Sequence, residues 1–242
     1  MTAPTKVRTR ARRGEGDRLR DELLAATEAL LVEGGEAAIT VRAVAARVGV
    51  STPAVYLHFP DKQALLDAVC LATWTGLSAA MENAAVGVDD PFEGLRLRGL
   101  AYVEFGLSHR EQYRVLLMRP HVDCADPECP VLAAGQRACD ELTAVVEQCV
   151  AQGIFRVDEP RQTTLALWAA AHGVVSLVIS GAIPAMAEMD LDALAAMTIE
   201  MAGLGGALRS RMPEHDPESQ LCKNSGPLVT GLDLLAAALP QD

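Results

Sequence analysis

The sequence is poor in aromatic residues and in long alternating runs of β-branched residues. Phe, Trp and Tyr make up only 4% of its 242 residues, while alanine and leucine dominate a chain that is 50% hydrophobic. Strands favour β-branched and aromatic side chains in a period of two, so this pattern argues against a fold built from sheets. The hydrophobic content is sufficient for one large or two modest buried cores. We therefore expect an all-α protein.

Motifs of common enzyme chemistries are absent as well. The chain contains no Gly-x-Ser-x-Gly turn, no glycine-rich phosphate-binding loop and no His-Glu-x-x-His pair. Its many carboxylates fall on the expected outer faces of helices, as solvated carboxylates do. We expect neither a catalytic residue nor a cofactor, and we interpret the protein as a non-enzyme.

Cysteines are few, and their spacing is not that of a metal site. One loop, residues 119–130, collects the potential ligands His121, Asp123, Cys124, Asp126, Glu128 and Cys129. Its Cys-x4-Cys spacing is looser than zinc sites favour, and no second Cys/His pair follows. Reactive thiols need an electropositive setting, which this acidic loop lacks. We predict no metal site, while the sequence leaves open whether Cys124 and Cys129 sense metal or oxidants.

No segment reads clearly as a secretory signal or a membrane span. The first 20 residues contain arginines but no apolar run, so we expect no signal peptide and a cytoplasmic location. Residues 162–187 carry no charge and are long enough to cross a bilayer. They contain serines, a histidine, a proline and much alanine, which is typical of a buried helix at a subunit interface. We favour that interface over a membrane.

Positive charge is concentrated at the N-terminus of an acidic chain. The net charge is −11, yet residues 1–20 hold seven Lys or Arg against two acidic residues. Residues 61–242 hold 12 basic and 25 acidic residues. The acidic part repels phosphate, so only the basic arm and the segment after it can face nucleic acid. Without a neighbouring DNA-binding motif, such an arm would be read as a solvated tail.

Residues 39–62 carry the clearest local pattern, two short helices separated by a glycine. Thr40 and Ser51 can each cap the helix that follows, because a hydroxyl can accept an unpaired amide of the first turn. Gly49 lies where a left-handed residue can end the first helix. The small core between the helices is expected to contain Val44, Val48, Val50 and Val55. This pattern predicts a helix-turn-helix, whose second helix enters the DNA major groove.

The segment TVRAVAARVGVSTPAVYLHFPDKQALL resembles the DNA-binding motif of the TetR-type bacterial transcriptional regulators. The most specific part is Tyr56-x-His58-Phe59-x-x-Lys62, which a generic helix-turn-helix does not require. The resemblance covers about residues 17–84. It implies that Tyr56, His58 and Lys62 touch or position the phosphate backbone of DNA.

Other DNA contacts are expected from position on the two short helices. Thr52 and Ala54 have short side chains that suit a thymine methyl group, and Pro53 is tolerated in the first turn of a helix. Thr40 and Arg42 can hold a further phosphate. The predicted DNA-binding residues are Thr40, Arg42, Ser51, Thr52, Pro53, Ala54, Tyr56, His58 and Lys62.

A weaker resemblance lies downstream, to a subgroup with a Trp-x-x-x-His-Gly signature, here Trp168, His172 and Gly173. It implies a helical body that binds a small molecule, which we expect to be largely apolar. The predicted ligand-binding residues are Tyr102, Phe105, Tyr113, Leu117, Met118, Trp168, His172 and Met186. Core packing is the competing interpretation for each of them, and Gly173 can instead let two helices approach closely.

The chain is expected to divide into four regions. These are a basic arm (1–16), a helix-turn-helix domain (17–84), a helical ligand-binding and dimerisation domain (85–210), and a polar linker and tail (211–242). The expected helices are 17–33, 41–48, 52–58, 61–84, 92–108, 110–118, 131–152, 160–182 and 190–210. The last two are apolar and sparse in charge, so we predict that they form a homodimer interface.

The sequence therefore predicts a dimeric, all-α transcriptional regulator of TetR type. We expect a repressor that binds a palindromic double-stranded operator and is released by a small-molecule effector. The alternatives are an activator or ligand-independent repressor of the same fold, a small-molecule carrier or enzyme that uses the helical body, and a membrane-associated protein.

Overall fold

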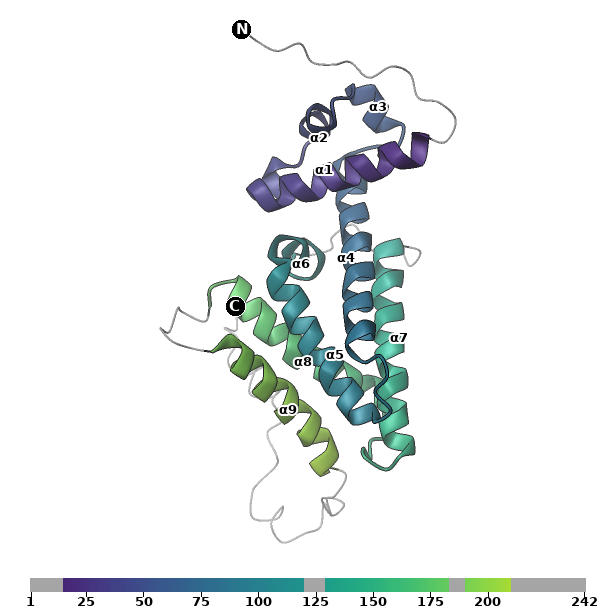
Figure 1. Ribbon diagram of the computed structural model, residues 1–242, viewed down its shortest axis with the longest axis vertical. Helices are drawn as coiled ribbons and strands as arrows, with labels where there is room; N and C mark the ends of the chain where they lie inside the picture. The colour runs from purple at the N-terminus through teal and green to yellow at the C-terminus, as the bar shows by residue number, and fades with distance from the viewer. Residues whose placement is uncertain (1–14, 120–128, 183–189, 210–242) are drawn as a thin grey trace, which may run out of the picture.

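A computed structural model describes residues 15–119, 129–182 and 190–209, and every regular element in these ranges is a helix (Figure 1). The elements are α1 (Glu15–Ala38), α2 (Val41–Val48), α3 (Thr52–Tyr56), α4 (Lys62–Ala84), α5 (Pro91–Ser108), α6 (Arg110–Leu117), α7 (Pro130–Ala151), α8 (Pro160–Ile179) and α9 (Leu191–Arg209). The all-α prediction is confirmed. Cys124, Met186, most of the N-terminal arm and the tail lie outside the described residues.

One helix, α4, belongs to both parts of the molecule. We call α1–α3 with the first turns of α4 the head, and α5–α9 with the rest of α4 the body. Figure 1 shows the head at one end, with α4 running from it between α5 and α7. Within the body, α5 packs against α4, α7, α8 and α9. A change at the body end of α4 can therefore move the head.

Caps fix where the helices of the head begin and end. Thr40 accepts a hydrogen bond from the amide of Ala43 (3.0 Å), and Asp61 caps α4 in the same way. Gly49 ends α2 with a φ of 77°, the left-handed conformation that favours glycine. Thr40 and Gly49 thus behave as the sequence predicts.

The expected cap at Ser51 is wrong. Its side chain makes no capping hydrogen bond, although α3 begins at the next residue. A cap would bond the amide of Pro53 or Ala54. Proline has no amide hydrogen, and the Ala54 amide already donates to the Ser51 carbonyl at 2.9 Å. The hydroxyl of Ser51 is thus left exposed on the surface of the head.

The first helix is longer than predicted. Gly34 and Gly35 interrupt it as expected, with Gly35 at a φ of 65°, but helical structure resumes as far as Ala38. The kink turns the last residues of α1 toward the start of α4, where Lys62 Nζ donates a hydrogen bond to the Glu36 carbonyl. The recognition helix α3 is shorter than expected, ending at Tyr56 rather than at residue 58.

Two apolar clusters hold the head. The first lies between α1, α2, α3 and α4 and includes Leu23, Val44, Val55 and Phe59, with Val48 and Val50 packed against it. It is the small core expected from the sequence. The second joins head to body, because residues of α1 and α4 share it with Val115 and Leu116 of α6 and Val131 of α7. The head is therefore anchored on the body by apolar packing.

Candidate functional site

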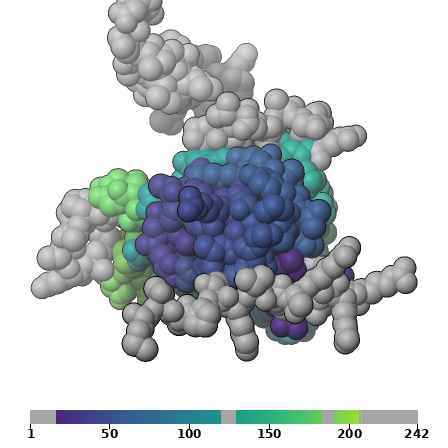
Figure 2. Space-filling model, turned by 90° about the horizontal axis from the view of Figure 1, so that it is seen from above, coloured from purple at the N-terminus to yellow at the C-terminus, as the bar shows by residue number. Residues whose placement is uncertain are grey.

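The recognition helix presents one face to solvent and one to the core. Val55 is fully buried and Phe59 is 2% exposed, whereas Tyr56 is 52% exposed. Ser51 and Pro53 are exposed, and Thr52, Ala54 and His58 are half-buried. Figure 2 shows this end of the molecule from above, with α1–α4 in purple and blue. The predicted base-contacting side chains thus lie on the open side of the head.

The start of α2 adds two more exposed groups. Thr40 and Arg42 are both on the surface. A hydroxyl has one hydrogen and two lone pairs, so Thr40 can cap α2 and still donate to a phosphate. Arg42 projects from the same turn. Arg47, at the other end of α2, is instead held in a two-pronged ion pair with Glu33 of α1, which lowers the pKa of that carboxyl.

Lys62, the last residue of the motif, forms polar contacts inside the head. Its Nζ donates to the backbone carbonyl of Glu36 (2.9 Å) and lies 3.8 Å from the Glu36 carboxylate. The side chain is 40% exposed, so part of it still meets solvent. The contact ties the start of α4 to the end of α1. Lys62 therefore links α1 and α4 within the head. Any contact with phosphate would have to share its Nζ group with Glu36.

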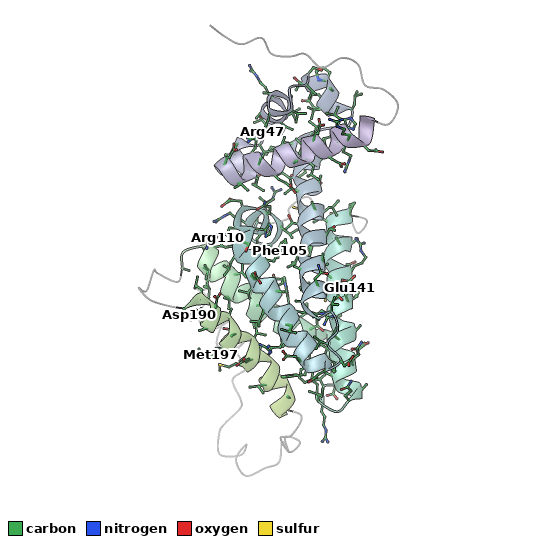
Figure 3. All side chains as sticks on the ribbon, in the orientation of Figure 1. Arg47, Phe105, Arg110, Glu141, Asp190 and Met197 are labelled. Atoms are coloured by element: carbon green, nitrogen blue, oxygen red, sulfur yellow. The ribbon has the colours of Figure 1, made fainter. Side chains whose placement is uncertain are left out.

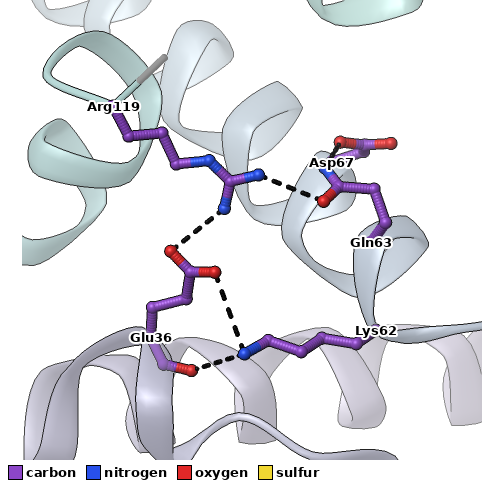
Figure 4. A network of polar contacts seen from close by, with 5 residues as sticks. All are labelled: Glu36, Lys62, Gln63, Asp67 and Arg119. Atoms are coloured by element: carbon purple, nitrogen blue, oxygen red, sulfur yellow. Dashed lines mark hydrogen bonds and ion pairs between the residues drawn. The ribbon is translucent and has the colours of Figure 1, made fainter. Parts of the chain in front are cut away.

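A polar cluster continues from Lys62 into the body (Figure 4). Arg119, just after α6, places Nη1 3.0 Å from Glu36 Oε2 and donates from Nη2 to Gln63 Oε1 at 3.1 Å. Gln63 in turn donates to Asp67 at 2.7 Å. Arg119 Nη1 is buried and has no well-aligned hydrogen bond, so its contact with Glu36 is mainly electrostatic. The cluster joins α1, α4 and α6 at one point.

The body encloses a cavity of about 580 Å³ between α4, α5, α7, α8 and α9. This volume lies within the range typical of small-molecule sites. Of the predicted ligand-binding residues, Tyr102, Leu117 and Trp168 line the cavity. Phe105, Tyr113, Met118 and His172 do not line it. Met186 is outside the described residues.

Phe105, labelled in Figure 3, packs outside the cavity lining. Its ring stacks on His109 at a centroid distance of 4.1 Å. It also packs against α4 at Gly76, where an added Cβ would lie 3.2 Å from the ring. The small residue in α4 leaves room for the ring, so Phe105 belongs to the contact between α4 and α5. The cavity lining therefore gives no support to its predicted contact with a ligand.

Tyr113 and His172 lie behind the cavity wall and are joined to it by hydrogen bonds. Trp168 Nε1 donates to the Tyr102 hydroxyl (3.0 Å), which is 2.7 Å from the Tyr113 hydroxyl. The Tyr113 hydroxyl lies 2.6 Å from His172 Nδ1. If the hydrogen bonds run in one direction from Trp168 to His172, each tyrosine hydroxyl accepts one hydrogen and donates its own. The last bond then ends on an unprotonated Nδ1, so the His172 imidazole is neutral and carries its hydrogen on Nε2.

Burial keeps the groups of this chain uncharged. It raises the pKa of Tyr102 to about 12 and raises that of Tyr113 further. It lowers the pKa of His172, in agreement with the neutral tautomer. The Trp-x-x-x-His spacing places the two rings one turn apart on α8, stacked at 5.4 Å. Trp168 and Tyr102 line the cavity, and Tyr113 and His172 support them from behind.

Gly173 does not create a close helix contact within the protomer. A Cβ added there would meet nothing within 4 Å. The close approach is made by Gly106 of α5, where a Cβ would lie 2.7 Å from Val175 of α8. The expectation that Gly173 lets two helices approach is therefore wrong for contacts inside one chain.

Sequence reasoning missed the contributions of α4 and α7 to the cavity. Trp74 and Met81 line it from α4, and an apolar row of α7 closes one side. That row is Val131, Gly135, Ala138 and Leu142. Its three- and four-residue spacing is the signature of a buried helix face and was readable in the sequence. Trp74 is one of only two tryptophans in the chain, and both line the cavity.

The outer side of α8 and α9 is apolar and exposed. Leu177 (47%), Met197 (55%) and Met201 (67%) form this exposed row, whereas the exposed Leu165 (45%) and Leu204 (49%) border the cavity. Met197 is labelled on α9 in Figure 3. By length and composition, α8 and α4 could each cross a membrane, but such helices also occur in soluble proteins. An apolar surface of this kind on a helical bundle is typical of a subunit interface.

The fold and the exposed recognition helix define a class, that of helix-turn-helix regulators with a ligand-sized cavity in a helical body. Residues 23–69 match the family model described as bacterial regulatory proteins, tetR family. Residues 95–202 match the tetracyclin repressor-like C-terminal domain. The chain belongs to the TetR family of bacterial transcriptional regulators.

Solved structures agree on the fold. A protein of unknown function from Rhodococcus sp. RHA1 is 28% identical, with 78% of this chain and 95% of that chain covered and a TM-score of 0.69. The TetR-family regulator PfmR from Thermus thermophilus is 24% identical, with 74% and 96% covered and a TM-score of 0.58. RolR, solved with resorcinol, is 15% identical, with 84% and 97% covered and a TM-score of 0.57. Comparison with curated proteins found no match.

Proposed function

We propose that this regulator is a cytoplasmic repressor that binds a palindromic double-stranded operator as a homodimer and is released when a small molecule fills the body cavity. One observation carries the proposal: α4 starts beside the recognition helix and also lines the 580 Å³ cavity with Trp74 and Met81. A ligand and the DNA-binding surface thus share one rigid element.

Base reading is assigned to the open face of α3. Thr52, Pro53 and Ala54 form its leading end, where base edges would lie, and their small size permits close approach. Tyr56, His58 and Thr40 carry donors for phosphate oxygens, with Arg42 beside them. Lys62 contributes mainly by fixing α4 on α1 through Glu36, so its effect on DNA affinity is indirect.

The exposed apolar row on α8 and α9 is assigned to the dimer. Burying it against the same row of a second copy makes a two-fold, self-complementary contact. Two heads would then face the same side of the DNA, and half-sites one helical turn apart would match them.

Release requires that the ligand favour a different arrangement of the heads. The shift can be no larger than the ligand's difference in affinity for the two arrangements. Contacts on Trp74 and Met81 act on α4 directly, and the cluster around Arg119 transmits motion of α6 to α1. RolR, which was solved with resorcinol, supports a small-molecule effector in this fold.

The test is selection of bound DNA from a random double-stranded pool, followed by titration of the selected site. We expect one palindromic site, bound by two protomers, with affinity that falls steeply as salt rises. Tyr56→Ala should weaken binding by tenfold or more (about 1.4 kcal/mol or more) while the dimer stays folded. Glu141→Gln, on the exposed side of α7, is the matched control and should bind as the wild type does.

Failure to select any site, or selection of a site bound by one protomer alone, would contradict the proposal. Repressor and activator are separated by transcription from the selected site in a purified system. Repression should be relieved, and not induced, by a cavity ligand.

A further inference from the structure

We infer that the effector is an uncharged, predominantly hydrophobic molecule, and that the cavity discriminates against anions. The inference rests on the proposed function of the cavity and adds the chemical class of its ligand. It follows from the state of each polar group on the cavity wall, taken over the residues that the structure describes.

The three arginines of the wall are already paired. Arg98 donates to Glu82 at 3.1 and 3.2 Å and to the Gly94 carbonyl at 3.2 Å, and its side chain is only 15% exposed. Arg96 makes two bonds of 2.7 Å to Glu93. These groups therefore bring a carboxylate each to the edge of the cavity, and the two-pronged Nε/Nη2 edge of each guanidinium is already occupied by it.

Arg161 is also paired with a carboxylate, through Nη1 alone. It forms an ion pair with Asp140, close along α7 to the wall residue Ala138. Glu200 adds a further negative charge to the wall, on an exposed side chain. The charged wall residues and their ion-pair partners thus comprise three positive and four negative groups. These are Arg96, Arg98 and Arg161 against Glu82, Glu93, Asp140 and Glu200. A ligand carboxylate or sulfonate would give up its water without gaining an unpaired cation.

The uncharged polar groups of the wall are also occupied. Trp168 donates its indole hydrogen to Tyr102, and Tyr102 is bonded to Tyr113. The hydroxyl of Thr164 lies 3.1 Å from the Pro160 carbonyl to which it donates. Gln136 and Glu200 are exposed to water, and the thiol of Cys139 is a weak hydrogen-bonding group. The remaining surface is apolar, so burial of hydrophobic area is the main source of affinity.

A matched pair of probes tests the inference on the full-length dimer. N-phenyl-1-naphthylamine is neutral, and 8-anilinonaphthalene-1-sulfonate has the same ring skeleton with a sulfonate added. The only two tryptophans, Trp74 and Trp168, line the cavity, so energy transfer from tryptophan to a bound probe reports occupancy of this site. We expect the neutral probe to bind at least about tenfold more tightly, which corresponds to ~1.4 kcal/mol.

The variant Glu82→Gln tests whether the pairing of Arg98 causes the preference for the neutral probe. Glu82 is 55% exposed, so its replacement should leave the fold intact while freeing Arg98. The preference for the neutral probe should fall at least about threefold in this variant. Glu33→Gln, which breaks an ion pair in the head, is the matched control and should leave the preference unchanged.

The outcomes distinguish a failure of the inference alone from a failure of the proposed function. Tighter binding of the sulfonate, or a preference that Glu82→Gln does not move, would overturn the inference and leave an effector cavity in place. If neither probe accepts energy from tryptophan, no hydrophobic ligand enters the cavity, and the proposed release mechanism fails with the inference. Thermal melting of Glu82→Gln confirms that the variant is folded before binding is compared.

Discussion

The head and the body are stabilised in different ways. The head packs the short helices α2 and α3 on α1 and the start of α4 around a core in which Val44, Val55 and Leu65 have no exposed surface. The body instead keeps a cavity of about 580 Å³ between its helices. Close packing favours a single arrangement, whereas an internal void leaves room for more than one. The comparison shows why one part can present a fixed surface while the other responds to a ligand.

The largest effect should come from removing a ring from the head core. Phe59 is 2% exposed, and Phe59→Ala should lower the free energy of unfolding by about 3–5 kcal/mol. Leu142→Ala in the cavity wall should cost less than about 2 kcal/mol, because that side chain already borders empty space. Urea unfolding followed by circular dichroism measures both. Equal losses would remove the contrast between the two parts.

The contact between head and body should show a smaller, coupled effect. Arg119→Met and Glu36→Gln should each cost about 1 kcal/mol, because the first removes one of two cations near the half-exposed Glu36 carboxylate and the second leaves the buried Arg119 Nη1 without its counter-charge. The double variant should cost less than the sum, with a coupling energy of about 1 kcal/mol. A double-mutant cycle of unfolding free energies gives this value. Strict additivity would show that the ion pair does not join the two parts energetically.

The two expected caps of the head provide an internal control. Thr40→Ala removes a capping hydrogen bond and should cost about 1 kcal/mol. Ser51→Ala removes none and should cost less than about 0.5 kcal/mol. Thermal denaturation of the two variants, each with one hydroxyl removed, tests the difference. A larger loss for Ser51→Ala would contradict the hydrogen bonding of α3.

The smallest effect is a dependence of stability on pH. The folded pKa of His172 is lowered by burial, so the unfolded chain binds a proton more readily. Stability should therefore decrease as pH falls through the ordinary histidine range, and it should level off once the folded protein is protonated as well. Because His172 is only half-buried, the loss should stay below about 1 kcal/mol. Comparing His172→Gln with the wild type at pH 7.5 and pH 5.5 isolates it, and an unchanged difference would refute it.

The sequence predicted the packed core of the head better than the cavity wall of the body, for a physical reason. Helix positions in the head follow from local features, such as Thr40 and Gly49, whose effects extend over one turn. Membership of the cavity wall depends on how helices far apart in the chain pack together. Of the predicted ligand-binding residues, Tyr102, Leu117 and Trp168 line the cavity, whereas Phe105 does not, because Gly76 in another helix leaves room for its ring. The paired state of Lys62 likewise depends on a kink after Gly35.

The most direct test of the link between cavity and head needs no identified ligand. Ala138 is 7% exposed and lines the cavity from α7, so Ala138→Phe fills part of it from within. We predict that this variant excludes N-phenyl-1-naphthylamine and binds the selected operator at least about tenfold more weakly, while its melting transition remains cooperative. Glu141→Gln, on the same helix, should bind both as the wild type does. A filled cavity with unchanged operator affinity would contradict the account.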